Sequence, residues 1–184
     1  MANSKTDLST FNNDWYNPGS PVKRALWYFA NIVFLLNPYN PFSKLKVFVL
    51  KMFGAKIGSG VVIKQRVNVK YPWKLTVGKN VWIGEQVWID NLGEVVIDDN
   101  ACVSQGAMLL CGNHNYKKSS FDLIVQNIKI EEGAWVGAKS VVCPGVTCKS
   151  HSILTVGSMA TKSLEAYGIY TGNPAKKIRE REIK

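Results

Sequence analysis

The amino-acid sequence predicts an all-β fold, a left-handed parallel β-helix built from six-residue repeats. Three observations indicate it: an aliphatic residue recurs every six positions, a small or β-branched residue stands four positions later, and glycine often directly follows the aliphatic residue. A period of six matches neither the 3.6-residue period of an α-helix nor the alternation of an ordinary strand. It fits a short strand and a tight turn, three of which close a triangular coil of about 18 residues.

The aliphatic positions run through most of the chain, with two-residue shifts after Val69 and Ile89 and a longer break after Leu109. Thirteen of the fifteen carry Ile, Val or Leu, a register that a β-sandwich would not require. They are Ile57, Ile63, Val69, Val77, Ile83, Ile89, Ile97, Val103, Leu109, Ile130, Val136, Val142, Cys148, Leu154 and Ala160. We expect these side chains to stack inside the prism, with glycine at turns that need unusual backbone angles.

Residues 1–56 lack the repeat and are expected to form a short helical and aromatic cap on the first coil, because terminal repeats need shielding. Segment 42–53 has apolar residues at helical spacing. The apolar run 25–36 is about half the length that a membrane-spanning helix needs. We expect it to pack on the domain, or to contact an anionic lipid surface, since Lys23 and Arg24 precede it.

Composition narrows the classes of partner. The net charge of +10 favours anionic partners, but the basic residues are scattered and do not alternate with aromatic ones, which argues against nucleic acid. The cysteines form no CxxC pair and only two histidines are present, so we expect no metal site and reduced, packed thiols. Residues 1–13 are polar and lack a signal-peptide pattern, which predicts a cytoplasmic protein, with peripheral contact at the inner membrane face if the apolar run binds lipid. The cysteines are Cys102, Cys111, Cys143 and Cys148.

The repeat breaks between Leu109 and Ile130, and this break carries the candidate chemistry. Segment 113–127 is too long for a tight corner and should protrude as a loop, where functional residues often lie on rigid repeat scaffolds. His114 stands at its base, and a histidine there can act as a general base near neutral pH. His151 lies within a regular turn and is expected to be a corner residue facing solvent.

Six short motifs resemble those of the hexapeptide-repeat acetyltransferases, over roughly residues 57–182. Within that family the chain is most similar to the branch associated with colanic acid and other exopolysaccharide biosynthesis. The motifs are Ile89–Leu92, Cys111–His114, Phe121–Ile124, Gly133–Gly137, Pro144–Thr147 and Gly172–Lys176. Two stretches depart from the family pattern: residues 148–151 lack the usual aliphatic-glycine start, and residues 163–170 lack prolines common before the last motif. These departures put the course of the return segment in doubt, not the chemistry.

The resemblance implies direct transfer from acetyl-CoA to a hydroxyl, in a homotrimer whose active sites lie between subunits. His114 would take the proton of the acceptor, and the backbone N–H of Ala138 would stabilise the oxyanion. Asp90 and Asn91, about one coil earlier, would orient the histidine or the acceptor. Trp135 matches a tryptophan that lines the family's active site. It is assigned to acceptor binding together with Asn113 and Tyr116, which flank the histidine.

Coenzyme A binding follows the same reasoning. Pantetheine is slender and would lie along a coil edge, bonding to backbone near Ala138, Val156 and Thr161. The nucleotide phosphates require cations near the end of the prism, and Lys176 and Arg179 match the family's basic positions. Lys162 completes the predicted basic group. Residues 165–184 should cross back over the prism and end in a charged helix or tail, 175–184.

The sequence thus predicts an O-acetyltransferase with acetyl-CoA as co-substrate and a sugar or lipid-linked oligosaccharide as acceptor in exopolysaccharide or other surface-polysaccharide biosynthesis. Two alternatives remain open: an acetyltransferase for a small free acceptor, such as a simple glycoside or an amino acid, and a non-catalytic β-helix interaction protein. Serine acetyltransferases carry a much longer helical N-terminal region. A zinc hydratase of the γ-carbonic-anhydrase type shares the fold but needs three histidines, whereas this chain has two.

Overall fold

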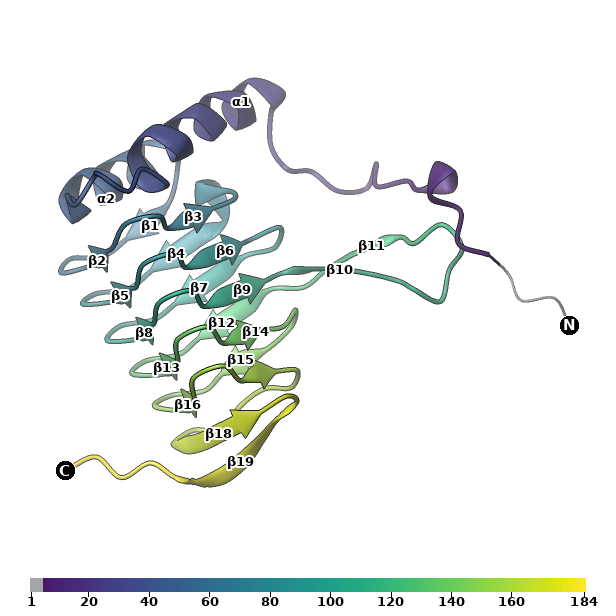
Figure 1. The fold of residues 1–184 in the computed structure, drawn as a ribbon. Coiled ribbons are helices and arrows are strands. Elements are labelled where there is room, and N and C mark those ends of the chain that lie inside the picture. Colours follow the sequence, from purple (N-terminus) through teal and green to yellow (C-terminus); the bar gives the residue numbers. More distant parts are fainter. Residues whose placement is uncertain (1–4) are drawn as a thin grey trace, which may run out of the picture.

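The computed structural model, which describes residues 5–184, is a triangular prism of stacked β-coils with helices over its N-terminal end (Figure 1). Each coil gives one strand to each of three parallel sheets. Sheet A has the order β1-β4-β7-β12-β15, sheet B the order β2-β5-β8-β13-β16-β18, and sheet C the order β3-β6-β9-β14-β17. A final strand, β19, pairs antiparallel with β18. The predicted parallel β-helix with a short helical cap is confirmed.

The strands are short because each spans only one side of the triangle. They are β1 (Lys56–Ile57), β2 (Val62–Ile63), β3 (Asn68–Val69), β4 (Leu75–Val77), β5 (Trp82–Ile83), β6 (Trp88–Asp90), β7 (Val95–Ile97), β8 (Cys102–Val103), β9 (Met108–Leu110), β10 (Gly112–His114), β11 (Leu123–Val125), β12 (Ile128–Ile130), β13 (Trp135–Val136), β14 (Val141–Val142), β15 (Thr147–Cys148), β16 (Ile153–Leu154), β17 (Met159–Ala160), β18 (Gly168–Gly172) and β19 (Ala175–Glu180). The helices are α1 (Pro21–Ala30) and α2 (Ser43–Met52), with a π-helical turn, η2 (Asn31–Leu35), and short 3₁₀ turns at Leu8–Thr10 and Pro72–Lys74.

The core of the prism consists of the repeat positions. All fifteen predicted interior side chains are buried, and the most exposed of them, Ile57, is only 8% accessible. They form columns: Ile57 pairs with Val77, which pairs with Ile97, and the column continues through Ile130 to Cys148. Removing these apolar surfaces from water is the main stabilising contribution to such a fold, and each coil contributes only with its neighbours.

The glycines that follow the aliphatic positions have a different cause from the one that the sequence suggests. Gly58, Gly84 and Gly137 do not adopt a positive φ. A Cβ at any of them would lie within 2.7 Å of backbone atoms of the next coil. Glycine is therefore needed at these corners because the coils approach one another closely.

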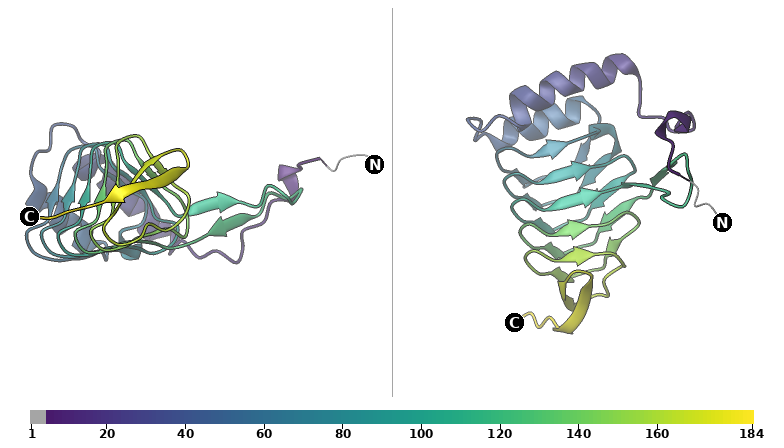
Figure 2. Two further views of the ribbon diagram at one scale, coloured as in Figure 1. Left: turned by 90° about the horizontal axis from the view of Figure 1, so that it is seen from below. Right: turned by 45° about the vertical axis from the view of Figure 1, so that its right-hand side comes forward.

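The two cap helices close the open edge of the first coil (Figure 2). On α2, Ser43 Oγ accepts from the Ile63 N–H (2.8 Å) and Lys46 Nζ donates to the Ile63 carbonyl (3.3 Å). On α1, Trp27 Nε1 donates to the Val69 carbonyl (2.8 Å). Side chains of the helices thus replace the missing neighbouring strand, which would otherwise leave backbone groups of β2 and β3 unpaired.

The outer side of the cap remains apolar and exposed. The predicted helix at 42–53 forms, but on α2 the buried residues are Lys46, Val49 and Leu50, and burial lowers the pKa of the Lys46 ammonium. The exposed apolar side chains of α1, η2 and α2, here called the cap face, are Val22, Leu26, Phe29, Ile32, Val33, Leu45, Phe48 and Met52. Among residues 5–184, every helix is too short or too polar to cross a bilayer.

The C-terminal segment differs from the predicted helix or tail. Residues 175–180 form β19, and only the last four residues continue as a tail. The outer edge of β18 is open at this end of the prism, and a charged strand covers it while discouraging further pairing. Arg181 then anchors the tail by donating to the carbonyls of Gly133 (2.9 Å) and His151 (3.2 Å).

Candidate active site

The break in the repeat is an antiparallel hairpin formed by β10 and β11, which projects from the corner between sheets C and A (Figure 1). His114 is the last residue of β10 and pairs with Leu123 of β11. At the turn, Asp122 accepts from Lys118 Nζ (2.7 Å) and Ser120 Oγ (2.6 Å), and these bonds lower the pKa of its carboxyl. The predicted loop is therefore a braced hairpin with His114 near its base.

The hydrogen bond of the His114 ring fixes its tautomer. Its Nδ1 lies 2.8 Å from the Phe121 carbonyl oxygen, and the two rings stack with centroids 4.4 Å apart at 7°. A carbonyl can only accept, so Nδ1 carries the hydrogen and the neutral ring keeps its lone pair on Nε2. Phe121 adopts a φ of 52°, the left-handed conformation, at the point where its carbonyl meets the ring. The half-buried His114 ring is therefore fixed in orientation, with Nε2 available as an acceptor.

A cavity of about 560 Å³ contains His114, and three parts of the chain line it. The hairpin contributes His114 and Leu123, the corners of the first coils contribute residues of 70–92, and the N-terminal segment contributes residues of 11–24. The residues from the coil corners are Lys70, Tyr71 and Leu92. Those from the N-terminal segment are Phe11, Asn13, Asp14, Tyr16, Pro18 and Arg24. Phe11 also contacts the histidine ring, with centroids 5.8 Å apart and the rings tilted by 54°.

Hydrogen bonds hold the N-terminal segment in place beside this cavity. Tyr16 Oη donates to the Leu92 carbonyl (2.8 Å), and Lys74 Nζ donates to that carbonyl as well (2.6 Å). Burial raises the pKa of the Tyr16 phenol and lowers the pKa of Lys74. Farther along, the Asp7 N–H donates to the Ser119 carbonyl at the hairpin turn (2.9 Å). Sequence reasoning did not identify these N-terminal residues as part of the site, because no repeat or motif marks them.

Asp90 and Asn91 lie at the corner one coil before the hairpin, as their spacing suggests. Asp90 pairs in register with Leu110, and its carboxylate is 2.8 Å from Lys70 Nζ. Asn91 is fully buried and bonds to both backbone groups of Tyr71 (2.9 and 2.6 Å). Asn91 therefore positions Tyr71 in a wall of the cavity, and within residues 5–184 its side-chain hydrogen bonds go to Tyr71 and not to His114.

Asn113 and Tyr116, the predicted acceptor-binding residues near His114, differ in their contacts. Asn113 Oδ1 accepts from the His114 N–H (2.8 Å), which fixes the strand end, while the Tyr116 side chain is largely exposed on the hairpin turn. The other histidine, His151, stacks on Tyr167 with centroids 4.9 Å apart and a φ of 59°. It is thus a packed corner residue distant from the hairpin.

Trp135 lies on β13 in sheet B, which Figure 1 shows on the side of the prism away from the hairpin. Its side chain is 44% exposed, and its Nε1 donates to Ser104 Oγ (2.8 Å). A cavity of about 570 Å³ lies here, lined by Trp135, Ile153, Ile169 and residues 179–182. Arg179 thus shares a cavity with Trp135.

Ala138 and Val156 occupy the corner between sheets B and C in consecutive coils. The Gly157 N–H donates to the Ala138 carbonyl (2.8 Å), which stacks the two turns. Within residues 5–184, the N–H groups of Ala138 and Val156 have no acceptor. These two donors are available to an oxyanion or to the amides of pantetheine.

The remaining predicted coenzyme residues do not lie at one corner. Thr161 and Lys162 are exposed after β17, at the corner between sheets C and A. Lys176 and Arg179 are exposed on β19, opposite Thr171 and Ile169. Apart from Thr161 and Lys162, the predicted site residues therefore fall into two groups within one chain, one around the His114 hairpin and one around Trp135, Ala138 and β19.

Thiol and metal chemistry have little support in the geometry. Burial raises the pKa of Cys111 to about 11 and that of Cys148 to about 12, so both thiols stay protonated at neutral pH. The described part of the chain contains no group of three His, Cys, Asp or Glu side chains placed to hold a metal ion.

Comparisons with known proteins identify similar acetyltransferases, although no family model matches the chain. An Escherichia coli K12 protein named as a colanic acid biosynthesis acetyltransferase, WcaF, is 35% identical over 176 residues, which are 95% of this chain and 97% of that protein. The galactoside O-acetyltransferase of the same organism is 26% identical, over 72% of this chain and 66% of its own.

Solved structures show the same fold. A hexapeptide-repeat acetyltransferase from Vibrio cholerae superposes with a TM-score of 0.79 at 15% identity, over 88% of this chain and 92% of that one. A galactoside acetyltransferase in complex with coenzyme A gives a TM-score of 0.77 at 23% identity, over 88% and 82%.

Proposed function

The chain belongs to the hexapeptide-repeat acetyltransferases, and we propose that it transfers an acetyl group from acetyl-CoA to a sugar hydroxyl in exopolysaccharide or other surface-polysaccharide biosynthesis. The observation that carries this proposal is the hydrogen bond between His114 Nδ1 and the Phe121 carbonyl (2.8 Å). It places the hydrogen of the ring on Nδ1 and leaves Nε2 facing a cavity with polar side chains as the nitrogen that can accept a proton. The similarity to a protein named for colanic acid biosynthesis supports a polysaccharide acceptor.

The proposed mechanism uses His114 first as base and then as acid. The acceptor hydroxyl donates to Nε2, and the proton moves there as the oxygen attacks the thioester carbonyl. The imidazolium keeps its Nδ1–H bond to the Phe121 carbonyl, which stabilises the positive charge. The oxyanion accepts from the free N–H of Ala138. Collapse of the intermediate releases the CoA sulfur, which takes the proton from Nε2, so the base is regenerated.

We propose that the active enzyme is a homotrimer with its sites between subunits. His114 and the Trp135–Ala138 segment lie on different sides of one chain, so a single chain would not bring them to the same substrate (Figure 1). In a ring of identical chains, the hairpin of one subunit would meet the corner between sheets B and C of the next. The unpartnered N–H groups of Ala138 and Val156 and the exposed Trp135 support that corner as the acetyl-CoA half of the site.

The coenzyme would lie along this corner toward the β19 end of the prism. Val156 would bond to pantetheine through its free N–H group, one coil beyond the Ala138 N–H that serves the oxyanion. The exposed Lys176 and Arg179 of β19 would pair with its phosphates. Thr161 and Lys162 lie at the corner between sheets C and A. They would therefore contact only a coenzyme that is bound in a neighbouring site of the trimer.

The test of the proposed function compares the two histidines. We expect His114→Ala to lower acetyl transfer about a hundred- to ten-thousandfold, the range typical of a lost general base, while acetyl-CoA still binds. The matched control is His151→Asn, because asparagine tolerates the left-handed backbone at that corner. Thiol release from acetyl-CoA with a panel of sugars and amino acids measures both variants. Near-normal turnover by His114→Ala, or turnover of amino acids alone, would contradict the proposal.

We further propose that the protein is cytoplasmic and that its cap face binds the surface of an anionic membrane. Along α1 and the following turn η2, Val22, Leu26, Phe29 and Val33 follow one another at helical spacing, and all four are exposed. The same holds for the outer side of α2, which also carries exposed lysines. Apolar side chains rimmed by cations are the composition of helices that lie in a membrane interface.

Flotation with lipid vesicles tests the membrane contact. Phe29→Ser with Phe48→Ser should reduce binding to vesicles of phosphatidylcholine and phosphatidylglycerol by about a hundredfold or more, since each buried phenylalanine contributes about 1.5–3 kcal/mol. The control, Ile178→Ser with Ile183→Ser, removes exposed apolar side chains at the opposite end of the prism. Equal binding by both double variants, or no binding by the unaltered protein, would refute the contact.

A further inference from the structure

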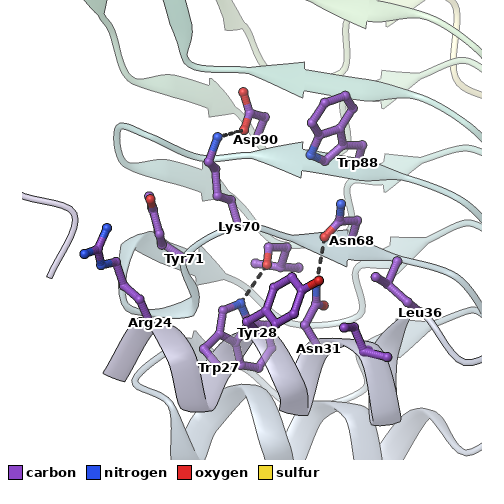
Figure 3. A pocket seen from close by; sticks show the side chains of 12 residues that line it. Arg24, Trp27, Tyr28, Asn31, Leu36, Asn68, Lys70, Tyr71, Trp88 and Asp90 are labelled. Atoms are coloured by element: carbon purple, nitrogen blue, oxygen red, sulfur yellow. Dashed lines mark hydrogen bonds and ion pairs between the residues drawn. The ribbon is translucent and has the colours of Figure 1, made fainter. Parts of the chain in front are cut away.

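A second cavity adjoins the one that contains His114. It has a volume of about 360 Å³ and lies between α1 with η2 and the outer side of sheet C (Figure 3). Arg24, Lys70 and Tyr71 line both cavities. The two cavities therefore form one groove that runs from His114 toward the helical cap, and the proposed reaction uses only its first half.

The second cavity contains buried polar atoms without partners. Asn31 is only 8% exposed, and its Nδ2 donates to Asn68 Oδ1 (2.8 Å), whereas its Oδ1 has no partner within residues 5–184. The buried Nε of Arg24 has none either. Leaving such atoms unpaired costs free energy, so a ligand that supplies hydrogen bonds to them would gain affinity. One atom accepts and the other donates, and hydroxyl groups satisfy both.

The walls of this cavity provide apolar ring surfaces. Trp88 of β6 and Tyr28 of α1 are 38% and 62% exposed, and both line the cavity. Figure 3 shows Asn68 between Asn31 and Trp88, so polar groups stand beside an aromatic ring. A sugar ring has the complementary surface, because its C–H face is apolar and its rim carries hydroxyls. Sites for small ligands of this kind have volumes of about 300–1,000 Å³, which includes this cavity.

The charges at the junction of the cavities favour a neutral ligand. Lys70 is paired with Asp90 at 2.8 Å, and Asp14 adds a carboxylate to the neighbouring cavity. Arg24 is therefore the one cation of the junction that a carboxylate does not pair with within residues 5–184. A phosphate would require more net positive charge than these side chains supply.

We propose that this second cavity binds a sugar unit adjacent to the one that is acetylated, so that the acceptor is an oligosaccharide rather than a single sugar. The inference rests on the proposed function and names its substrate class. The target sugar would place its hydroxyl at His114 Nε2, and the next unit would stack on Trp88. Its hydroxyls would bond to Asn31 Oδ1 and Arg24 Nε.

The experiment uses a glycan array incubated with the full-length protein and radiolabelled acetyl-CoA. The array carries single sugars and matched glycans of two or more units that share the same terminal sugar. We expect label on the longer glycans to exceed label on their matched single sugars by about tenfold, the gain that an aromatic contact with hydrogen bonds provides. Trp88→Ala should remove this preference while single sugars are labelled as before.

The matched control is Trp82→Ala, which alters the same residue type in the same coil, on sheet B. It should keep the preference, and thermal unfolding of both variants establishes that they fold. Equal labelling of single sugars and longer glycans by the unaltered protein would overturn the second subsite and leave the acetyltransferase proposal standing. Equal losses on both classes in Trp88→Ala would also overturn it. Absence of label on every sugar would overturn the proposed sugar acceptor itself.

Discussion

The two groups of site residues are built in different ways. Around His114, the cavity combines the hairpin, two coil corners and the N-terminal segment 11–24, joined by side-chain hydrogen bonds. Around Ala138, the surface consists of consecutive regular turns whose free groups are backbone N–H groups. In the proposed site this difference would separate two tasks: a fixed repeat surface suits a coenzyme that is always the same, and an irregular pocket suits an acceptor that differs between relatives.

The two regions should also differ in how strongly a substitution disturbs their structure. The Ala138 corner is supported by buried columns on the adjoining strands, with Val136 and Val142 fully buried. The hairpin has no such column and depends on contacts of its turn and of the N-terminal segment. Regions with few buried apolar contacts open more readily, so the acceptor side should be the more mobile half of the site.

The largest effect expected of a donor-side change is that of Val156→Trp. Val156 is mostly exposed at the corner, so a tryptophan would fold but fill the path of pantetheine, and activity should fall about a hundredfold or more. Mixing subunits of Val156→Trp with subunits of His114→Ala then tests whether the two halves belong to different chains. In random mixed trimers, about a quarter of the interfaces would join an intact hairpin to an intact corner, so about a quarter of the activity should return.

Mixing the same two proteins without dissociating them is the control and should restore nothing. If subunit exchange restores no activity although mixed trimers form, both halves act within one chain and the comparison fails. Light scattering of the unaltered protein gives the assembly independently. A fully active monomer would also show that both halves of the site act within one chain.

The second effect concerns the basic end of the coenzyme path. Lys176→Ala with Arg179→Ala should raise the KM for acetyl-CoA about tenfold with little change in kcat, because phosphate contacts bind ground state and transition state alike. The effect should be smaller with dephospho-CoA thioesters. Lys56→Ala with Lys79→Ala removes the same charge from the other end of the prism and serves as control. If the KM rose equally in both double variants, the effect would come from net charge and not from these two side chains. If the KM of Lys176→Ala with Arg179→Ala rose equally for acetyl-CoA and for the dephospho-CoA thioester, the proposed contact with the 3′-phosphate would be wrong.

The repeat made the prism predictable because each interior position obeys one local rule. The columns through Ile57 and Ile63 could be listed in advance, and they are buried. The structure at the two ends of the prism could not be predicted from this rule. Lys46 is buried because it meets open carbonyls of β2, and β19 is a strand because β18 offers an open edge, and neither circumstance is visible in local composition.

The cavity of the candidate site could be anticipated where it coincides with the break in the repeat, and not elsewhere. His114 was identified by that break. Phe11, Tyr16 and Arg24 were missed because their place in the cavity depends on a path of the N-terminal segment that only long-range bonds to Leu92 and the hairpin define. Sequence spacing put Asn91 at the right corner, but whether its amide faces the cavity or Tyr71 depends on packing.

The smallest effect that the comparison predicts lies in the hairpin turn. Asp122→Asn weakens the bonds to Lys118 and Ser120, which brace the turn that carries Phe121, so kcat should fall about two- to threefold, as befits an exposed ion pair. Because the pKa of Asp122 is lowered in the folded chain, its stabilising contribution is present at neutral pH and is lost as pH falls through that pKa. Amide exchange of the hairpin should therefore differ between variant and unaltered protein at neutral pH, and converge in acid.

Glu165→Gln is the matched change on the other side. Glu165 is also exposed, pairs with Lys149 at 2.7 Å, and has a lowered pKa, but it lies on the prism between Leu164 and β18 and not in the hairpin. It should leave kcat unchanged, because the surrounding coil is held by its buried column and does not rely on one surface pair. If Glu165→Gln lowered kcat as much as Asp122→Asn, the hairpin would be no more dependent on side-chain bonds than the coils are. The proposed difference in stability between the irregular acceptor half and the regular donor half would then be wrong.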